Sequence, residues 1–311
     1  MRVIFFGTSA FAVPSLEALH AHGHAVVMCV TQPDRPRGRG LALEPSPVKR
    51  AALRLETPLS QPEHLNAGLF GALHPDVGVV AAYGELIRRD VLALPMHGML
   101  GVHPALLPAY RGAAPVAWAI LNGETTTGVT IFKLNERLDA GSILIRQPVA
   151  IEPDEPADAL TERLARHGAS ALLVALEALA AGRATCELQD ESQATFAPKL
   201  TKVQGQVDWR APADAIARLV RAMSPWPGAT TTYGGKPLKL WKASLEVAAP
   251  QGLAPGTVVH IGADGMTVAA GQGAVVIREV QPPGRRRMSV KEFLAGHPVS
   301  VGDKFGGPWS V

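Results

Sequence analysis

Residues 100–115 read LGVHPALLPAYRGAAP, a stretch too rich in proline and glycine for a helix yet apolar enough to lie against the body of a protein. The apolar run at residues 99–102 predicts a strand that ends at His103, and Pro104 biases that histidine toward extended backbone. A titratable side chain at the end of a strand, followed by an apolar wall, is typical of a site in an α/β protein. The alternative interpretation is a histidine buried in a well-packed loop.

Strands and helices alternate along the first 200 residues. Apolar runs of β type lie at residues 2–6, 24–30, 76–82, 99–103, 129–134 and 143–151. Helical patterns lie at residues 11–22, 48–55, 62–73, 85–92, 115–121 and 154–181. This alternation predicts an α/β fold with a doubly wound, Rossmann-like parallel sheet, in which Tyr83, Gly84 and His103 meet at the carboxyl edge.

Two loops carry residue types that suit a functional site. Residues 31–47 read TQPDRPRGRGLALEPSP, and a loop of this length inside a compact domain is usually functional. Its three arginines, Arg35, Arg37 and Arg39, favour contact with phosphate, although a solvated charged loop is the alternative. The second loop holds Asp139 in a tight LDAG turn, where an aspartate taken alone is best explained as an Asx-turn residue.

Composition limits the class of protein. A chain of 311 residues has room for about two domains, its hydrophobic content is 47%, and it has no apolar run long enough to span a bilayer. Cys29 and Cys186 lie far apart without a paired framework, so we expect reduced thiols in a cytoplasmic protein. Gly7 lacks the companion glycines of a nicotinamide dinucleotide motif. The ten histidines show no metal-ligand spacing, so we expect no metal.

The character of the sequence changes at about residue 205. Residues 206–311 carry 12 Lys and Arg against 7 Asp and Glu, whereas residues 1–205 carry 18 against 20. After a predicted helix at residues 213–221, five short β-like runs separated by glycine turns favour a small OB-like β-barrel. Side chains for a positive groove come from Lys236, Lys239, Lys242 and Arg285–Arg287. These features predict a nucleic-acid-binding domain, with an ordinary basic domain as the alternative.

Several motifs together resemble the methionyl-tRNA formyltransferase family over nearly the whole chain. They are FFGTSAFAVPSL (5–16), TQPDRPRGRG (31–40), PSPVK (45–49), VVAAYGELI (79–87), VHPALLPAYRGAAP (102–115), GETTTGVTIFKL (123–134), LDAG (138–141) and PKLTK (198–202). The second domain adds VDW (207–209), SPWPGA (224–229) and LKLWKAS (238–244). The arginine loop and the C-terminal domain distinguish this family from the shorter glycinamide ribonucleotide formyltransferases.

The resemblance implies transfer of a formyl group from 10-formyltetrahydrofolate to the α-amino group of initiator methionyl-tRNA, for translation initiation. It implies a folate-binding catalytic domain over residues 1–205 and an OB-like tRNA-binding domain over residues 206–311, in a cytoplasmic monomer. The family's site combines an Asn-x-His motif with an aspartate from an LD[TA]G turn, and the last two positions match His103 and Asp139. His103 would donate to the oxyanion or relay protons, and Asp139 would stabilise its charged form.

The resemblance also assigns binding residues. The folate co-substrate is expected to contact Tyr83, Gly84, Ala105, Leu106, Leu107 and Pro108. The tRNA is expected to contact Arg35, Arg37, Arg39, Lys202, Lys236, Lys239 and Lys242. Among these, we expect Arg39 to contribute most.

The sequence departs from the family at two positions near the histidine. The family's asparagine, an amide donor to the oxyanion, is replaced by Gly101, and the common serine of SLLP is Ala105. Loss of one oxyanion donor typically lowers a rate by about 10²–10³. Two alternatives therefore stay open. One is a formyltransferase acting on a small amine such as an amino sugar, and the other is a catalytically impaired homologue that binds tRNA or folate.

Overall fold

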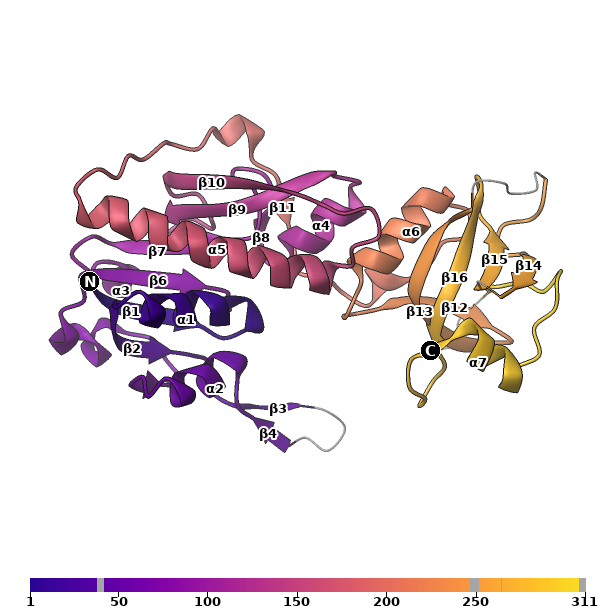
Figure 1. Ribbon diagram of the computed structural model, residues 1–311, viewed down its shortest axis with the longest axis horizontal. Helices are drawn as coiled ribbons and strands as arrows, with labels where there is room; N and C mark the ends of the chain where they lie inside the picture. Colours follow the sequence, from indigo (N-terminus) through magenta and orange to yellow (C-terminus); the bar gives the residue numbers. More distant parts are fainter. Residues whose placement is uncertain (38–41, 247–251, 264, 308–311) are drawn as a thin grey trace. The chain divides into compact units, whose positions relative to one another are not determined.

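The protein was analysed as a computed structural model, which describes residues 1–37, 42–246, 252–263 and 265–307 (Figure 1). The chain forms two compact units. Unit 1 comprises Met1–Pro115, Thr126–Ala150 and Thr161–Pro198, and unit 2 comprises Val116–Thr125, Ile151–Leu160 and Lys199–Val311. The assignment of a catalytic domain to residues 1–205 and a tRNA-binding domain to residues 206–311 stays a prediction.

Unit 1 is built on a seven-stranded mixed sheet in the order β10-β9-β7-β6-β1-β2-β5 (Figure 1). Its strands are β1 (Arg2–Gly7), β2 (Ala25–Val30), β5 (Leu59–Ser60), β6 (Val77–Ala81), β7 (Met99–His103), β9 (Thr126–Lys133) and β10 (Ile143–Ala150). Strands β7, β6, β1, β2 and β5 pair in parallel, whereas β9 is antiparallel to both β7 and β10. The predicted α/β fold with a Rossmann-like sheet is confirmed, with an antiparallel strand added to the parallel part.

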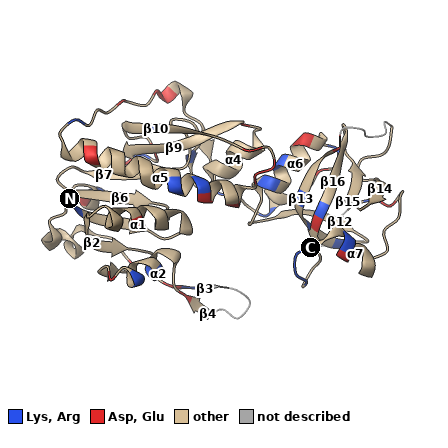
Figure 2. Ribbon diagram, in the orientation of Figure 1, with Lys and Arg blue, Asp and Glu red and all other residues tan. Residues whose placement is uncertain are grey.

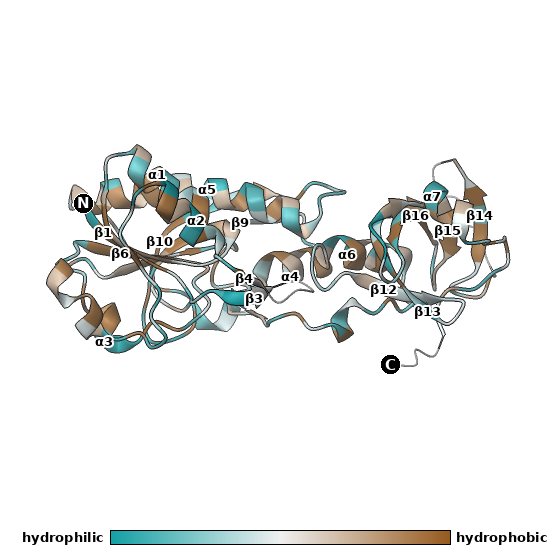
Figure 3. Cartoon of the chain, turned by 90° about the horizontal axis from the view of Figure 1, so that it is seen from below, coloured by the Kyte–Doolittle hydropathy of each residue, from teal (hydrophilic) through white to brown (hydrophobic). Residues whose placement is uncertain are grey.

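The helices of unit 1 alternate with its strands along the chain. They are α1 (Val13–Ala21), α2 (Pro47–Arg54), α3 (Arg89–Leu92) and most of α5 (Ala157–Ala180), with short 3-10 turns η1 (Ala10–Ala12), η2 (Ala67–Leu69) and η3 (Gly71–Leu73). Along α5, hydrophilic and hydrophobic bands alternate in Figure 3. This alternation is typical of helices that bury one side against a sheet and expose the other.

One expected helix, at residues 62–73, does not form, and another, at residues 85–92, is shortened to α3. Residues 62–73 form only the turns η2 and η3, because Gly68 and Gly71 weaken a helix there. Residues 85–88 stay outside α3, and Ile87 packs into the apolar core ahead of the helix. In both segments, local composition and tertiary packing outweigh a helical pattern of apolar residues.

Residues 31–47, expected to be a loop, contain a short hairpin of β3 (Arg35–Arg37) and β4 (Ala42–Glu44). Arg39, in the connection between the two strands, lies outside the described residues. The segment ends at Ser46, whose hydroxyl accepts a hydrogen bond from the backbone N–H of Lys49 and caps α2. Lys49 is paired with Asp34 at 2.5 Å, which ties the base of the hairpin to the helix.

Unit 2 carries a separate antiparallel sheet in the order β12-β13-β16-β15-β14, with β17 paired to β16. Its elements are β12 (Ala229–Tyr233), β13 (Lys236–Glu246), β14 (Val258–Gly262), β15 (Gly265–Ala269), β16 (Ala274–Gln281), β17 (Met288–Ser289), α4 (Pro115–Leu121, all but its first residue), α6 (Ala213–Ala222) and α7 (Val290–Gly296). The five predicted β-runs are confirmed as strands. Helix α7 was not predicted, although Ser289 and Glu292 form the capping box that begins it.

Candidate active site

His103 is the last residue of β7, and its side chain is buried, with 7% of its surface exposed. The imidazole Nε2 lies 2.9 Å from the carbonyl oxygen of Tyr110. Because a carbonyl oxygen only accepts hydrogen bonds, Nε2 carries the proton in this contact. The other ring nitrogen, Nδ1, lies 3.7 Å from Oδ2 of Asp139, which is beyond hydrogen-bonding distance. Nδ1 is therefore the nitrogen that faces the carboxylate.

Asp139 lies in the turn between β9 and β10, 36 residues after His103 in the sequence. Its Oδ2 accepts a hydrogen bond of 2.8 Å from the backbone N–H of Gly112. The two-residue strand β8 (Arg111–Gly112) thus connects the two side chains. The carbonyl of Tyr110, directly before β8, binds His103, and the N–H of Gly112 within β8 binds Asp139. Asp139 and Tyr110 both adopt left-handed backbone angles, with φ of +49° and +60°. Non-glycine residues hold such angles only where their surroundings fix them, and these residues cluster at functional sites.

The backbone after His103 is fixed by side chains of the neighbouring strands. Thr130 Oγ1 donates a hydrogen bond of 2.6 Å to the carbonyl oxygen of Ala105 and accepts one of 3.1 Å from the N–H of Leu107. Arg146 donates a hydrogen bond of 2.7 Å to the carbonyl oxygen of Leu107. Ala105 and Leu107 are buried, whereas Leu106 and Pro108 are partly exposed. Within the expected folate wall, Leu106 and Pro108 are therefore the residues whose side chains offer surface to a ligand.

Tyr83 and Gly84 follow β6, which pairs with β7, so they lie at the same carboxyl edge as His103. The ring of Tyr83 is 2% exposed and packs edge-on against Phe6, with ring centroids 5.6 Å apart. Burial, with a smaller contribution from the charge of Glu85, raises the pKa of Tyr83 to about 12. Tyr83 is therefore buried, with its carbonyl oxygen bound by Thr8 Oγ1 at 2.7 Å, and the exposed Gly84 is the residue of this pair that a ligand can reach.

Gly101 faces Phe132 across the β7–β9 pair. A Cβ atom at this position would lie 2.7 Å from Cζ of Phe132 and 2.8 Å from Cδ1 of Leu134. The Phe132 ring is 3% exposed and stands edge-on to the His103 imidazole, with centroids 6.5 Å apart. The space beside Gly101 is thus filled by apolar side chains.

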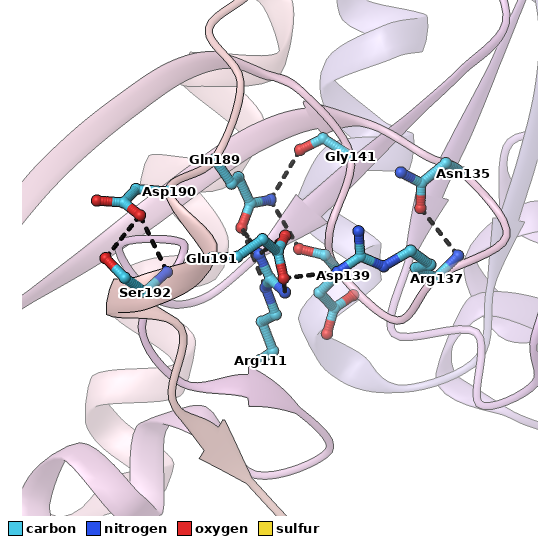
Figure 4. Close-up of polar contacts among 9 residues, drawn as sticks. All are labelled: Arg111, Asn135, Arg137, Asp139, Gly141, Gln189, Asp190, Glu191 and Ser192. Carbon is cyan, nitrogen blue, oxygen red and sulfur yellow. Dashed lines mark hydrogen bonds and ion pairs between the residues drawn. The ribbon is translucent and has the colours of Figure 1, made fainter.

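A polar network that the sequence did not predict lies beside Asp139 (Figure 4). The Arg111 guanidinium, 2% exposed, binds both oxygens of Glu191 and the side-chain oxygen of Gln189. The Gln189 amide in turn donates to the carbonyl oxygens of Asp139 and Gly141. Gln189 and Glu191 lie about 80 residues after Arg111, and no local pattern marks them in the sequence.

The expected tRNA contacts belong to both units. Arg35 is exposed, and the Arg37 side chain and Arg39 lie outside what the structure describes. In unit 2, Lys202, Lys236 and Lys242 are exposed. Lys239 is partly buried, where it donates to the carbonyl oxygen of Pro227 and lies 5.5 Å from the Trp241 ring centroid.

Part of the basic excess of unit 2 is neutralised within the unit. Basic and acidic residues lie next to one another on α6, β16 and α7 in Figure 2. Arg286 pairs with Glu292 at 2.7 Å, and Arg287 pairs with Glu279 at 2.5 Å. Within the described ranges, no group of three His, Cys, Asp or Glu side chains is placed to hold a metal ion. No helix in the described part of the chain is long and apolar enough to cross a membrane.

Comparisons with known proteins define the class first. A family model described as "Formyl transferase" matches residues 1–176, and one described as "Formyl transferase, C-terminal domain" matches residues 199–298. The chain resembles the crystal structure of an N-formyltransferase from Helicobacter canadensis with a TM-score of 0.68 and 14% identity, covering 89% of this chain and 98% of that one. At that identity the likeness concerns the fold.

Curated relatives identify the family within this class. A methionyl-tRNA formyltransferase of Roseiflexus sp. (strain RS-1) is 46% identical over 98% of this chain and 95% of its own length. One from Trichlorobacter lovleyi is 43% identical over 97% of this chain and 96% of its own. The chain belongs to the methionyl-tRNA formyltransferase family, as its motifs predicted.

Proposed function

We propose that this protein transfers a formyl group from 10-formyltetrahydrofolate to the α-amino group of initiator methionyl-tRNA, in the cytoplasm and as a monomer. Relatives named for this activity match nearly the whole chain, including both domains. The observation that carries the proposal is the buried His103 facing the Asp139 carboxylate at the carboxyl edge of the parallel sheet. An edge of this kind is where open α/β sheets bind their ligands.

The reaction needs a proton carrier and a charged partner. The neutral α-amine attacks the formyl carbon, a new C–N bond forms, and the carbonyl oxygen becomes an oxyanion. When the adduct collapses, the bond from the formyl carbon to the folate nitrogen breaks, and that nitrogen takes the proton that the amine loses. His103 Nδ1, which is not committed to a hydrogen bond, is suited to carry this proton, and Asp139 stabilises the protonated ring.

The binding residues are proposed on the same basis. Leu106 and Pro108 offer apolar surface for the folate, and Gly84, next to the buried Tyr83, offers backbone. Arg35, Arg37 and Arg39 of the hairpin segment, with Lys202, Lys236, Lys239 and Lys242, are proposed to contact tRNA phosphates. The proposed folate-binding residues adjoin His103. Leu106 and Pro108 follow it along the chain, and Tyr83 and Gly84 follow β6, which pairs with the strand of His103.

One observation favours a second candidate, a folate- or tRNA-binding homologue with little turnover. Gly101 supplies no amide donor, and Phe132 and Leu134 fill the space beside it. The presence of both His103 and Asp139, with Nδ1 and Oδ2 3.7 Å apart, supports the transferase instead.

The test compares acceptors under identical conditions. The purified chain is incubated with 10-formyltetrahydrofolate and either initiator methionyl-tRNA, free methionine or an amino sugar, and formylated product is measured. The proposal expects product with the tRNA and little with the small amines. Product only with a small amine, or tight binding of tRNA and folate without any product, would contradict it.

A further inference from the structure

We infer that Gln189 is a positioning residue for the His103–Asp139 pair. It acts through the backbone of the Asp139 turn and does not touch the reacting groups. The inference rests on the proposed formyl transfer, and it deepens that proposal by adding a part of the site that the sequence motifs do not mark.

All the hydrogen-bonding capacity of the Gln189 side chain is used in one place (Figure 4). Its amide nitrogen donates 2.8 Å to the carbonyl oxygen of Asp139 and 2.7 Å to that of Gly141. Its amide oxygen accepts from two guanidinium nitrogens of Arg111, at 3.1 Å and 2.7 Å. Carbonyls only accept and a guanidinium only donates, so these partners fix which end of the amide faces which group.

One of the two carbonyls that Gln189 binds belongs to Asp139, a residue with a left-handed backbone angle. Asp139 has φ of +49°, an angle that non-glycine residues keep only where their surroundings hold it. The Gln189 bonds lie on both sides of Ala140, on the carbonyls of Asp139 and Gly141, so they hold the backbone from which the carboxylate projects.

The same side chain joins this turn to the loop that holds His103. Arg111 belongs to β8, which directly follows the Tyr110 carbonyl bound to His103 and includes the Gly112 N–H bound to Asp139. Through its Arg111 contact, Gln189 therefore fixes the position of the histidine loop relative to the aspartate turn. Misplacing catalytic groups by about 1 Å can cost about 100-fold in rate.

Other residues of the 187–197 segment also contact the loop after His103 and the turn that holds Asp139. The side chain of Glu191 binds Arg111 and Arg137, and Phe196–Ala197 (β11) pairs in parallel with β8. The backbone N–H of Tyr110 donates to Thr195 Oγ1 at 2.8 Å. Within this segment, Gln189 is the residue whose side chain bonds directly to the backbone of Asp139.

The decisive variant is Gln189→Glu, which keeps the shape of the side chain but replaces the two donors by an oxygen that repels the two carbonyls. Gln193→Glu is the matched control, because Gln193 lies in the same segment and its side chain bonds only to Asp190 nearby in the sequence. Steady-state kinetics with initiator methionyl-tRNA and 10-formyltetrahydrofolate are measured for both variants and for the unmodified chain. Gln189→Asn, which keeps the donors on a shorter side chain, serves if Gln189→Glu does not fold.

A positioning role predicts that kcat falls roughly 10- to 100-fold in Gln189→Glu while both KM values stay within about threefold. Gln193→Glu is expected to retain full activity. A folded Gln189→Glu or Gln189→Asn variant whose kcat stays within twofold would overturn the inference. If the unmodified chain shows no transfer, the proposed function fails. Crystal structures of the unmodified and Gln189→Glu chains then decide the positioning role, which an unchanged His103–Asp139 separation would refute.

Discussion

Replacing Gly101 by asparagine would place a Cβ atom 2.7 Å from Cζ of Phe132 and 2.8 Å from Cδ1 of Leu134. Carbon atoms in contact prefer about 3.5–4.0 Å, so the Phe132 ring would have to move by about 1 Å. Phe132 is 3% exposed and packs with Leu107 and Ile143, so little space is open to it. The variant that would supply the amide implied by the family resemblance is therefore expected to destabilise the protein.

Overpacking of this kind costs about 1–3 kcal/mol in the free energy of unfolding. For a unit of this size, each kcal/mol lowers Tm by roughly 2–4 °C. Thermal unfolding of Gly101→Asn, followed by circular dichroism, measures the loss. Phe132→Leu removes Cζ, so the double variant should be more stable than the sum of the two single losses predicts.

Formylation rates complete the experiment. The amide in Gly101→Asn/Phe132→Leu would have room to reach the site, so the double variant should transfer formyl groups faster than Phe132→Leu alone. A single variant Gly101→Asn as stable as the unmodified chain would refute the packing argument.

Two further predictions follow from groups outside the His103–Asp139 pair. Burial raises the pKa of Tyr83 to about 12 from an ordinary value near 10, so the folded protein keeps this proton while the unfolded chain loses it, and stability should fall as the pH rises from 10 to 12. Tyr83→Phe should make that part of the decline in Tm smaller, and an identical decline would show that Tyr83 does not cause it. Arg39→Ala should raise KM for initiator methionyl-tRNA several-fold and weaken the salt dependence of KM, with less effect on folate binding. Unchanged tRNA kinetics would remove Arg39 from the interface.

The fold was largely predictable because its signals are local. The continuous apolar run at residues 76–82 and the run that ends at His103 both became strands of the parallel sheet. The prediction of a helix at residues 62–73 was wrong because two glycines interrupt an otherwise helical pattern. The helix α7 could have been found from the Ser289–Glu292 capping signal.

The site was predictable only in part, because its remaining members meet through tertiary structure. Motifs predicted His103 and Asp139, whose side chains the structure places 3.7 Å apart, but nothing near Gln189 in the sequence indicates that it bonds to a turn 50 residues earlier. The consequence of Gly101 also depends on strand register, since only the β7–β9 pairing places Phe132 opposite it. A missing side chain in the sequence thus became a filled space in the structure.

The measurement that tests the central claim most directly is single-turnover formylation of initiator methionyl-tRNA by the unmodified chain and by Asp139→Asn. Asparagine keeps the size of the side chain and an oxygen for the Gly112 N–H, but it removes the charge that faces His103. Loss of this charge is expected to slow formyl transfer by about 10²–10⁴, the usual contribution of acid–base catalysis, without lowering Tm by more than a few degrees. Equal rates for the two chains would contradict a catalytic His103–Asp139 pair.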